Sequence, residues 1–167
     1  MNDIVTSVLT GVGATLVMDV WGVVRKQLFG IPPADYGMVG RWIGHMAHGQ
    51  FRHERIAAAS PITGERILGW SSHYLIGIAF ACGFVWIVGF EWLRHPTLAP
   101  ALVFGIATVV APFLMMQPGM GAGIAASRTP KPNTARLQSL MTHTAFGVGL
   151  WAAGWIQLIC RDPLHAS

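Results

Sequence analysis

The chain has 167 residues, 53% hydrophobic and only 11% charged, with a mean hydropathy of +0.50. Soluble domains normally carry about 25% charged residues, so the composition excludes an ordinary water-soluble protein. The formal net charge is +4 and the pI is about 9.7. Because the Lys and Arg residues lie between apolar runs, we expect them to face anionic membrane lipids and not nucleic acid.

Four apolar segments approach the roughly 20 residues needed to cross a bilayer as a helix. The first starts within a few residues of Met1 and lacks a basic leader region, so we expect it to be retained as a span. The sequence predicts an all-α fold, a four-transmembrane-helix bundle forming one integral membrane domain over residues 1–167. The expected spans are about 4–24, 72–92, 98–117 and 140–159.

The basic residues predict the orientation of these spans. Nine of the eleven Lys and Arg residues follow the first span or separate the third from the fourth, and only two lie on the other side. By the positive-inside rule, both long loops are cytoplasmic in a bacterial inner membrane. We therefore expect both termini to be periplasmic, and the short 91–97 connection to face the same side.

The first long loop contains an apolar periodicity typical of a helix on a membrane surface. Its polar face carries Arg41, His45 and His48. This pattern predicts an interfacial amphipathic helix over 38–46 on the inner leaflet. The apolar face is formed by Met38, Val39, Trp42, Ile43 and Met46.

The third span is interrupted by prolines. Pro100, Pro112 and Pro118 occur within it, and the chain stays apolar to Ser127. Two structures fit this pattern: a long kinked helix, or a span followed by a broken, partly buried segment.

Three ionisable residues lie within the spans, namely Asp19, His73 and His143. Each is six or seven residues from a cytoplasmic arginine, so all three are expected at one depth, roughly 10 Å from the charged belt. Each also shares a helix face with small residues, which favours an orientation into the bundle. We expect them, with Glu65 leading into the second span, to form a ligand-binding or proton-relay cluster. The alternative is that Asp19 is paired only to hold the bundle together.

Other chemistry is less well supported by the sequence. His73 and His143 could hold haem or a metal between two parallel helices, and this remains an alternative to the expectation of no cofactor. Cys82 and Cys160 have no CxxC partner, and no CxxCH motif for covalent haem is present. We expect four basic side chains to bind lipid headgroups: Arg41, Arg128, Lys131 and Arg136.

Four motifs extend over most of the chain: GATLVMDVW, GRWIGHMAHGQFRHERIAAASPITGERILGWSSHYLIGIAFA, TVVAPFLMMQPGMGAGIAASRTPKP and ARLQSLMTHTAFGVGLW. Together they resemble a bacterial family of small integral membrane proteins, the domain-of-unknown-function family 2938. The resemblance covers nearly the whole chain and implies a four-span inner-membrane protein without an assigned reaction. It therefore supplies no catalytic residue.

These patterns favour a protein that is not an enzyme and that transports or senses a small solute or protons through the buried Asp/His cluster. The short chain suggests that a homo-oligomer or a larger membrane complex would build the complete pathway. Two other functions stay open. One is a membrane redox protein that uses His73 and His143, and the other is a structural accessory subunit.

Overall fold

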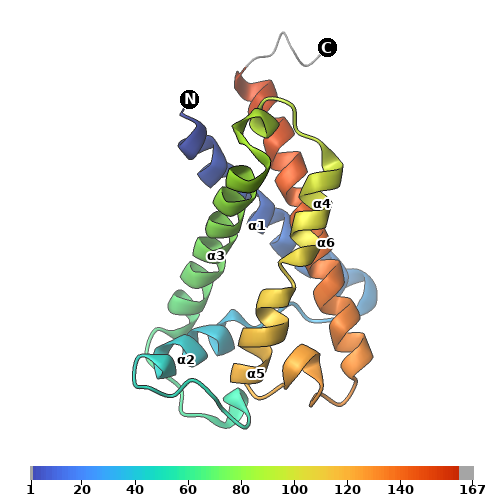
Figure 1. Cartoon of the computed structure of the whole chain (residues 1–167). Coiled ribbons are helices and arrows are strands. Elements are labelled where there is room, and N and C mark those ends of the chain that lie inside the picture. The colour runs from blue at the N-terminus through green and yellow to red at the C-terminus, as the bar shows by residue number, and fades with distance from the viewer. Residues whose placement is uncertain (1, 162–167) are drawn as a thin grey trace. The chain divides into compact units, whose positions relative to one another are not determined.

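A computed structural model describes residues 2–161, and every regular element within that range is helical, as the sequence predicts (Figure 1). Asn2 caps the first helix by accepting a hydrogen bond from the Ile4 N–H, and Gly30 ends it in the left-handed conformation. The elements are α1 (Asp3–Phe29), α2 (Tyr36–Met46), η1 (Ile56–Ala58), α3 (Glu65–Val88), η2 (Phe90–Leu93), α4 (Leu98–Ala107), the π-helical η3 (Pro112–Met116), α5 (Gln117–Gly119), η4 (Ile124–Ala126) and α6 (Pro132–Arg161).

Within the described residues, three helical segments are long and apolar enough to cross a membrane: α1, α3 and the continuous stretch Leu98–Gly119. They correspond to the first three predicted spans, although α3 begins and ends several residues earlier than expected. The fourth predicted span lies within α6, which is not among these three.

The chain divides into two compact units. Unit 1 comprises residues 1–33, 74–107 and 142–167, and unit 2 comprises residues 34–73 and 108–141. Helices α3 and α6 therefore contribute residues to both.

In unit 1 the helices approach each other through small residues, which let backbones come close in membrane proteins. On α1, Gly11 lies against the backbone of Ile78 in α3. Gly149 of α6 lies against Ala14 of α1, where an added Cβ would come within 2.8 Å of the Ala14 Cα. Any larger side chain at these positions would force the helices apart.

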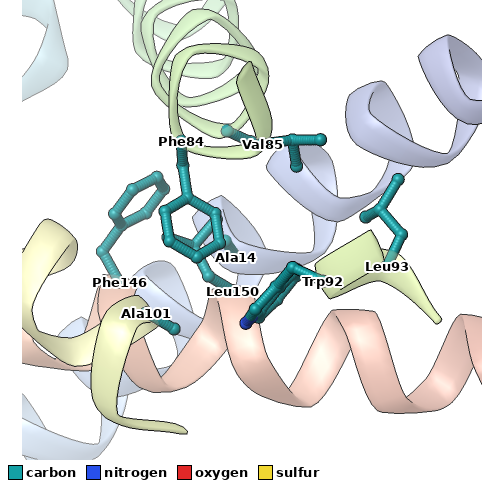
Figure 2. Close-up of a cluster of buried hydrophobic side chains, with 9 residues drawn as sticks. Ala14, Phe84, Val85, Trp92, Leu93, Ala101, Phe146 and Leu150 are labelled. Atoms are coloured by element: carbon teal, nitrogen blue, oxygen red, sulfur yellow. The ribbon is translucent and has the colours of Figure 1, made fainter. Parts of the chain in front are cut away.

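The hydrophobic core of unit 1 surrounds Phe84 and Leu150, both fully buried (Figure 2). The Phe84 ring meets Trp92 edge-on, with ring centroids 4.7 Å apart. Many large apolar side chains of this unit are exposed instead, a surface that suits lipid better than water. They include Leu16, Val20, Leu75, Trp86, Ile87, Val103 and Ile156.

In unit 2, α2 packs against the first turns of α3. A Cβ added to Gly40 would collide with the backbone of Glu65, and one added to Gly69 would collide with the Tyr36 carbonyl. The predicted helix over 38–46 is confirmed as part of α2, but its buried side contains Gly37, Val39, Gly40 and Arg41. Arg41, which the sequence pattern predicts on the polar face, lies instead in the packed interface.

The proline-rich third segment remains helical to Gly119 and then breaks. Pro112 has no N–H to donate to the Thr108 carbonyl, which accepts instead from the Ala111 N–H at 3.1 Å. The helix widens into a π-helical turn at this point. Beyond Gly119, Ala125 and Ala126 both adopt positive φ, at 47° and 59°. The segment thus joins a helix containing a π-turn to a tight irregular loop.

Candidate functional site

The four residues expected to form a ligand or proton cluster divide between the units. Asp19 and His143 belong to unit 1, whereas Glu65 and His73 belong to unit 2. The contacts of each pair are therefore described within its own unit.

In unit 1, Asp19 on α1 accepts a hydrogen bond from Tyr74 on α3. The Tyr74 Oη lies 2.9 Å from the Asp19 Oδ2, and both residues are half-buried. One face of α3 is fixed against α1 nearby, because Gly77 lies against the Thr15 side chain. A phenol is a good hydrogen-bond donor to a carboxylate, so this contact ties α1 to α3.

Sequence reasoning missed Tyr74. It is 55 residues from Asp19, and no local pattern specifies that the two side chains meet. The available signal was a tyrosine directly after His73 near the start of an apolar span, because its hydroxyl can donate to a carboxylate.

His143 lies on α6, half-buried. Gly105 of α4 lies so near to α6 that an added Cβ would come within 2.9 Å of the His143 carbonyl oxygen. The backbone around His143 is therefore held closely against α4.

A second polar contact of unit 1 joins α1 to α6. The side-chain amide of Gln157 lies 2.7 Å from the Thr10 Oγ1, and Thr10 also donates to the Thr6 carbonyl at 2.8 Å. Thr6 and Thr10 are almost completely buried. Sequence reasoning overlooked this group because threonine and glutamine carry no charge.

In unit 2, Glu65 forms an ion pair with Arg41. The guanidinium donates from Nε and Nη2 to the two carboxylate oxygens, both at 2.8 Å. Arg41 Nη1 also donates to the carbonyls of Ile56 and Ala59. Glu65 in turn accepts from the Ile62 N–H. The carboxylate raises the pKa of Arg41 above its ordinary value, mainly through these hydrogen bonds.

This placement changes the interpretation of both residues. Arg41 was expected to bind lipid headgroups, but its guanidinium is occupied by protein acceptors. Glu65, expected in the polar cluster, joins α2 and the loop before α3 to the start of α3.

His73 lies against aromatic rings. It stacks on Tyr36 with centroids 4.0 Å apart and planes at 23°, and it meets Trp70 edge-on at 5.9 Å. Tyr36 and Trp70 are themselves 4.6 Å apart. Stacking of this kind fixes the orientation of the imidazole ring.

The loop histidines form a chain of hydrogen bonds. His45 Nε2 lies 3.0 Å from the Ser60 carbonyl, and His45 Nδ1 lies 2.7 Å from His53 Nε2. A neutral His45 that donates to Ser60 must accept from His53. His53 Nδ1 is then a buried acceptor with no partner in the described chain. An open pocket of about 650 Å³ borders this histidine, lined by Gln50, Arg52, His53, Glu54, Arg55, Ala58 and Ala59.

The remaining basic residues expected at lipid headgroups differ in exposure. Arg128 and Lys131 are exposed. Arg136 is half-buried, and its Nε donates to the Ala125 carbonyl at 2.8 Å. As to metals, residues 2–161 contain no group of three or more His, Cys, Asp or Glu side chains arranged to hold an ion.

Comparison with known families identifies the chain. The sequence model of the family described as "Protein of unknown function (DUF2938)" matches residues 8–157, so the chain belongs to this family, as its motifs suggested. The comparisons with curated proteins and with solved structures found no match.

Proposed function

We propose that the chain is a multi-pass protein of the bacterial inner membrane and that α6 is its fourth span. With 30 residues, α6 is roughly 45 Å long, more than a bilayer core requires. It exposes apolar side chains, among them Val148, Ile156 and Ile159. Its polar residues His143 and Gln157 lower its hydropathy, yet both are half-buried.

Within this protein we propose that Asp19 and Tyr74 form the core of a site that moves or senses protons or a small solute. The observation that carries this proposal is the 2.9 Å hydrogen bond between two helices that are each apolar enough to span a membrane. Intramembrane carboxylates are costly and typically mark ion and proton pathways. We propose His143, in the same unit, as a second proton-exchanging group.

The exposed Arg128 and Lys131 are proposed to contact lipid headgroups. A homo-oligomer is proposed to complete the pathway, because a chain of 167 residues offers few helices to enclose one.

Proton flux into proteoliposomes tests the proposed role of Asp19. Vesicles that contain the purified protein and a trapped pH-sensitive dye receive an external acid pulse. We expect the wild type to acidify the lumen faster than protein-free vesicles do, and Asp19→Asn to abolish that difference. Tyr74→Phe should slow the flux, because the carboxylate loses its donor.

Glu91→Gln serves as the matched control, because Glu91 also belongs to unit 1 but is exposed and paired only with exposed residues. It should leave the flux unchanged. Flux that persists in Asp19→Asn, or a wild type no faster than empty vesicles, would overturn the proton-pathway proposal.

A further inference from the structure

Arg25 is a buried cation that has no acidic partner among the described residues. It lies in the last two turns of α1, and only 7% of its surface is exposed. Within residues 2–161, no Asp or Glu forms an ion pair with it. Lys26, the next residue, is exposed and illustrates the usual position of a basic residue at this helix end.

The hydrogen-bonding groups of Arg25 are only partly used. Its Nη1 donates to the Thr142 Oγ1 at 3.3 Å, and its Nη2 donates to the Pro32 carbonyl at 3.2 Å. Its Nε is buried and has no acceptor in the described chain. A guanidinium has five N–H donors, and both acceptors found here are neutral.

The charge cannot be removed by deprotonation, because arginine remains protonated in proteins. Burying an unpaired charge is strongly unfavourable. The C-terminal end of α1 offsets only part of this charge through the helix dipole. The unused N–H groups of Arg25 and its uncompensated positive charge would both be satisfied by an anion.

We infer that Arg25 binds an oxyanion of the phosphate type, at the place where α1, the returning segment at Pro32 and α6 at Thr142 meet within unit 1. A planar guanidinium with free donors matches the geometry of a phosphate group. Pro32 is exposed and Thr142 is half-buried, so two of the residues that accept from the guanidinium reach the surface of the unit. Either a lipid headgroup or free phosphate could supply this chemistry. The inference is independent of the proposed role of Asp19.

Thermal unfolding of the full chain tests this site. The purified protein is melted in an uncharged detergent with increasing sodium phosphate, at ionic strength held constant with sodium chloride. It is also melted in phosphatidylcholine nanodiscs with and without phosphatidylglycerol. At a tenfold excess over Kd we expect the melting temperature to rise by about 3–5 °C in at least one series.

Two variants and a control define the result. Arg25→Gln should lose the rise, and Arg25→Lys should keep part of it, because the charge remains while the planar donor geometry is lost. Lys26→Gln changes the same charge on the neighbouring exposed residue and should behave as the wild type.

A rise with inorganic phosphate identifies a site for a free anion, and a rise only with phosphatidylglycerol identifies a lipid headgroup. No rise with either probe, or an equal rise in Arg25→Gln, would overturn the inference and leave Arg25 as a clamp on the segment at Pro32. If Arg25→Gln does not fold, the comparison of Arg25→Lys with the wild type decides: an undiminished rise in Arg25→Lys overturns the inference.

Discussion

At the scale of single residues, the partner of each ionisable side chain is determined by residues that are distant in sequence but close in space. The sequence predicts that Arg41 lies on a helix at the membrane surface, with lipid headgroups as its expected partner. Its actual partner is Glu65, 24 residues away, and no local pattern specifies that pairing. Asp19 and Tyr74 are 55 residues apart and were missed as a pair for the same reason.

The Arg41–Glu65 ion pair should contribute measurably to stability. Arg41→Ala removes the guanidinium that pairs with the Glu65 carboxylate and leaves the carbonyls of Ile56 and Ala59 without this donor. We expect the melting temperature in detergent to fall by several degrees.

The exposed ion pair of Arg94 with Glu91 is the matched control. It has the same 2.8 Å separation, but both side chains are more than half exposed. Water screens such pairs, so Arg94→Ala should change the melting temperature little. Equal effects of Arg41→Ala and Arg94→Ala would show that the buried pair has no special role in holding unit 2 together.

Ala125 offers a prediction of the opposite sign. Its φ of 47° is unfavourable for a residue with a Cβ, whereas glycine adopts it readily. Glycine removes the cost of this conformation in the folded state, but it also gives the unfolded chain more conformational freedom, which opposes folding. We expect the net effect of Ala125→Gly to be a stabilisation of about 0.5–1 kcal/mol. Ala122→Gly, in the same loop, has no positive φ to relieve and should destabilise it. Thermal unfolding measures both, and a lower melting temperature for Ala125→Gly would contradict the backbone conformation described here.

At the scale of elements, close backbone approach determines which helices pack. Gly69 and Gly83 both lie on α3, but a Cβ on Gly69 would meet the Tyr36 carbonyl, whereas one on Gly83 would meet open space. We expect Gly69→Ala to separate α2 from α3 and to lower the melting temperature strongly. Gly83→Ala should be neutral or stabilising by up to about 1 kcal/mol, because alanine favours a helix. Similar losses in both variants would refute the α2–α3 packing.

The helices themselves were largely predictable. Apolar length located α1, α3 and Leu98–Gly119, and apolar periodicity located α2. The faces of α2 were not predictable, because Arg41 looks like a solvated residue until Glu65 is placed beside it. The π-turn at Pro112 was not predictable either. The prolines were compatible with a long kinked helix and with a span followed by a broken segment, and nothing in the sequence decided between them.

At the scale of the whole molecule, the central claim is that this chain crosses the membrane four times, with Asp19 and Tyr74 inside the bilayer. The claim rests on three apolar helical segments, on the proposed crossing by α6, and on the distribution of basic residues. Both chain ends, Met1 and the residues after Arg161, lie outside the described residues, so their predicted periplasmic position depends on sequence alone.

Cysteine accessibility in intact cells tests this claim most directly. Cys82 and Cys160 are first replaced by alanine, and single cysteines are introduced at Arg94 and at Thr134, both exposed. A membrane-impermeant maleimide should label Arg94→Cys and a C-terminal cysteine tag from outside, and Thr134→Cys only after the membrane is opened. Labelling of Thr134→Cys in intact cells, or of the C-terminal tag only in opened ones, would contradict four crossings in this orientation.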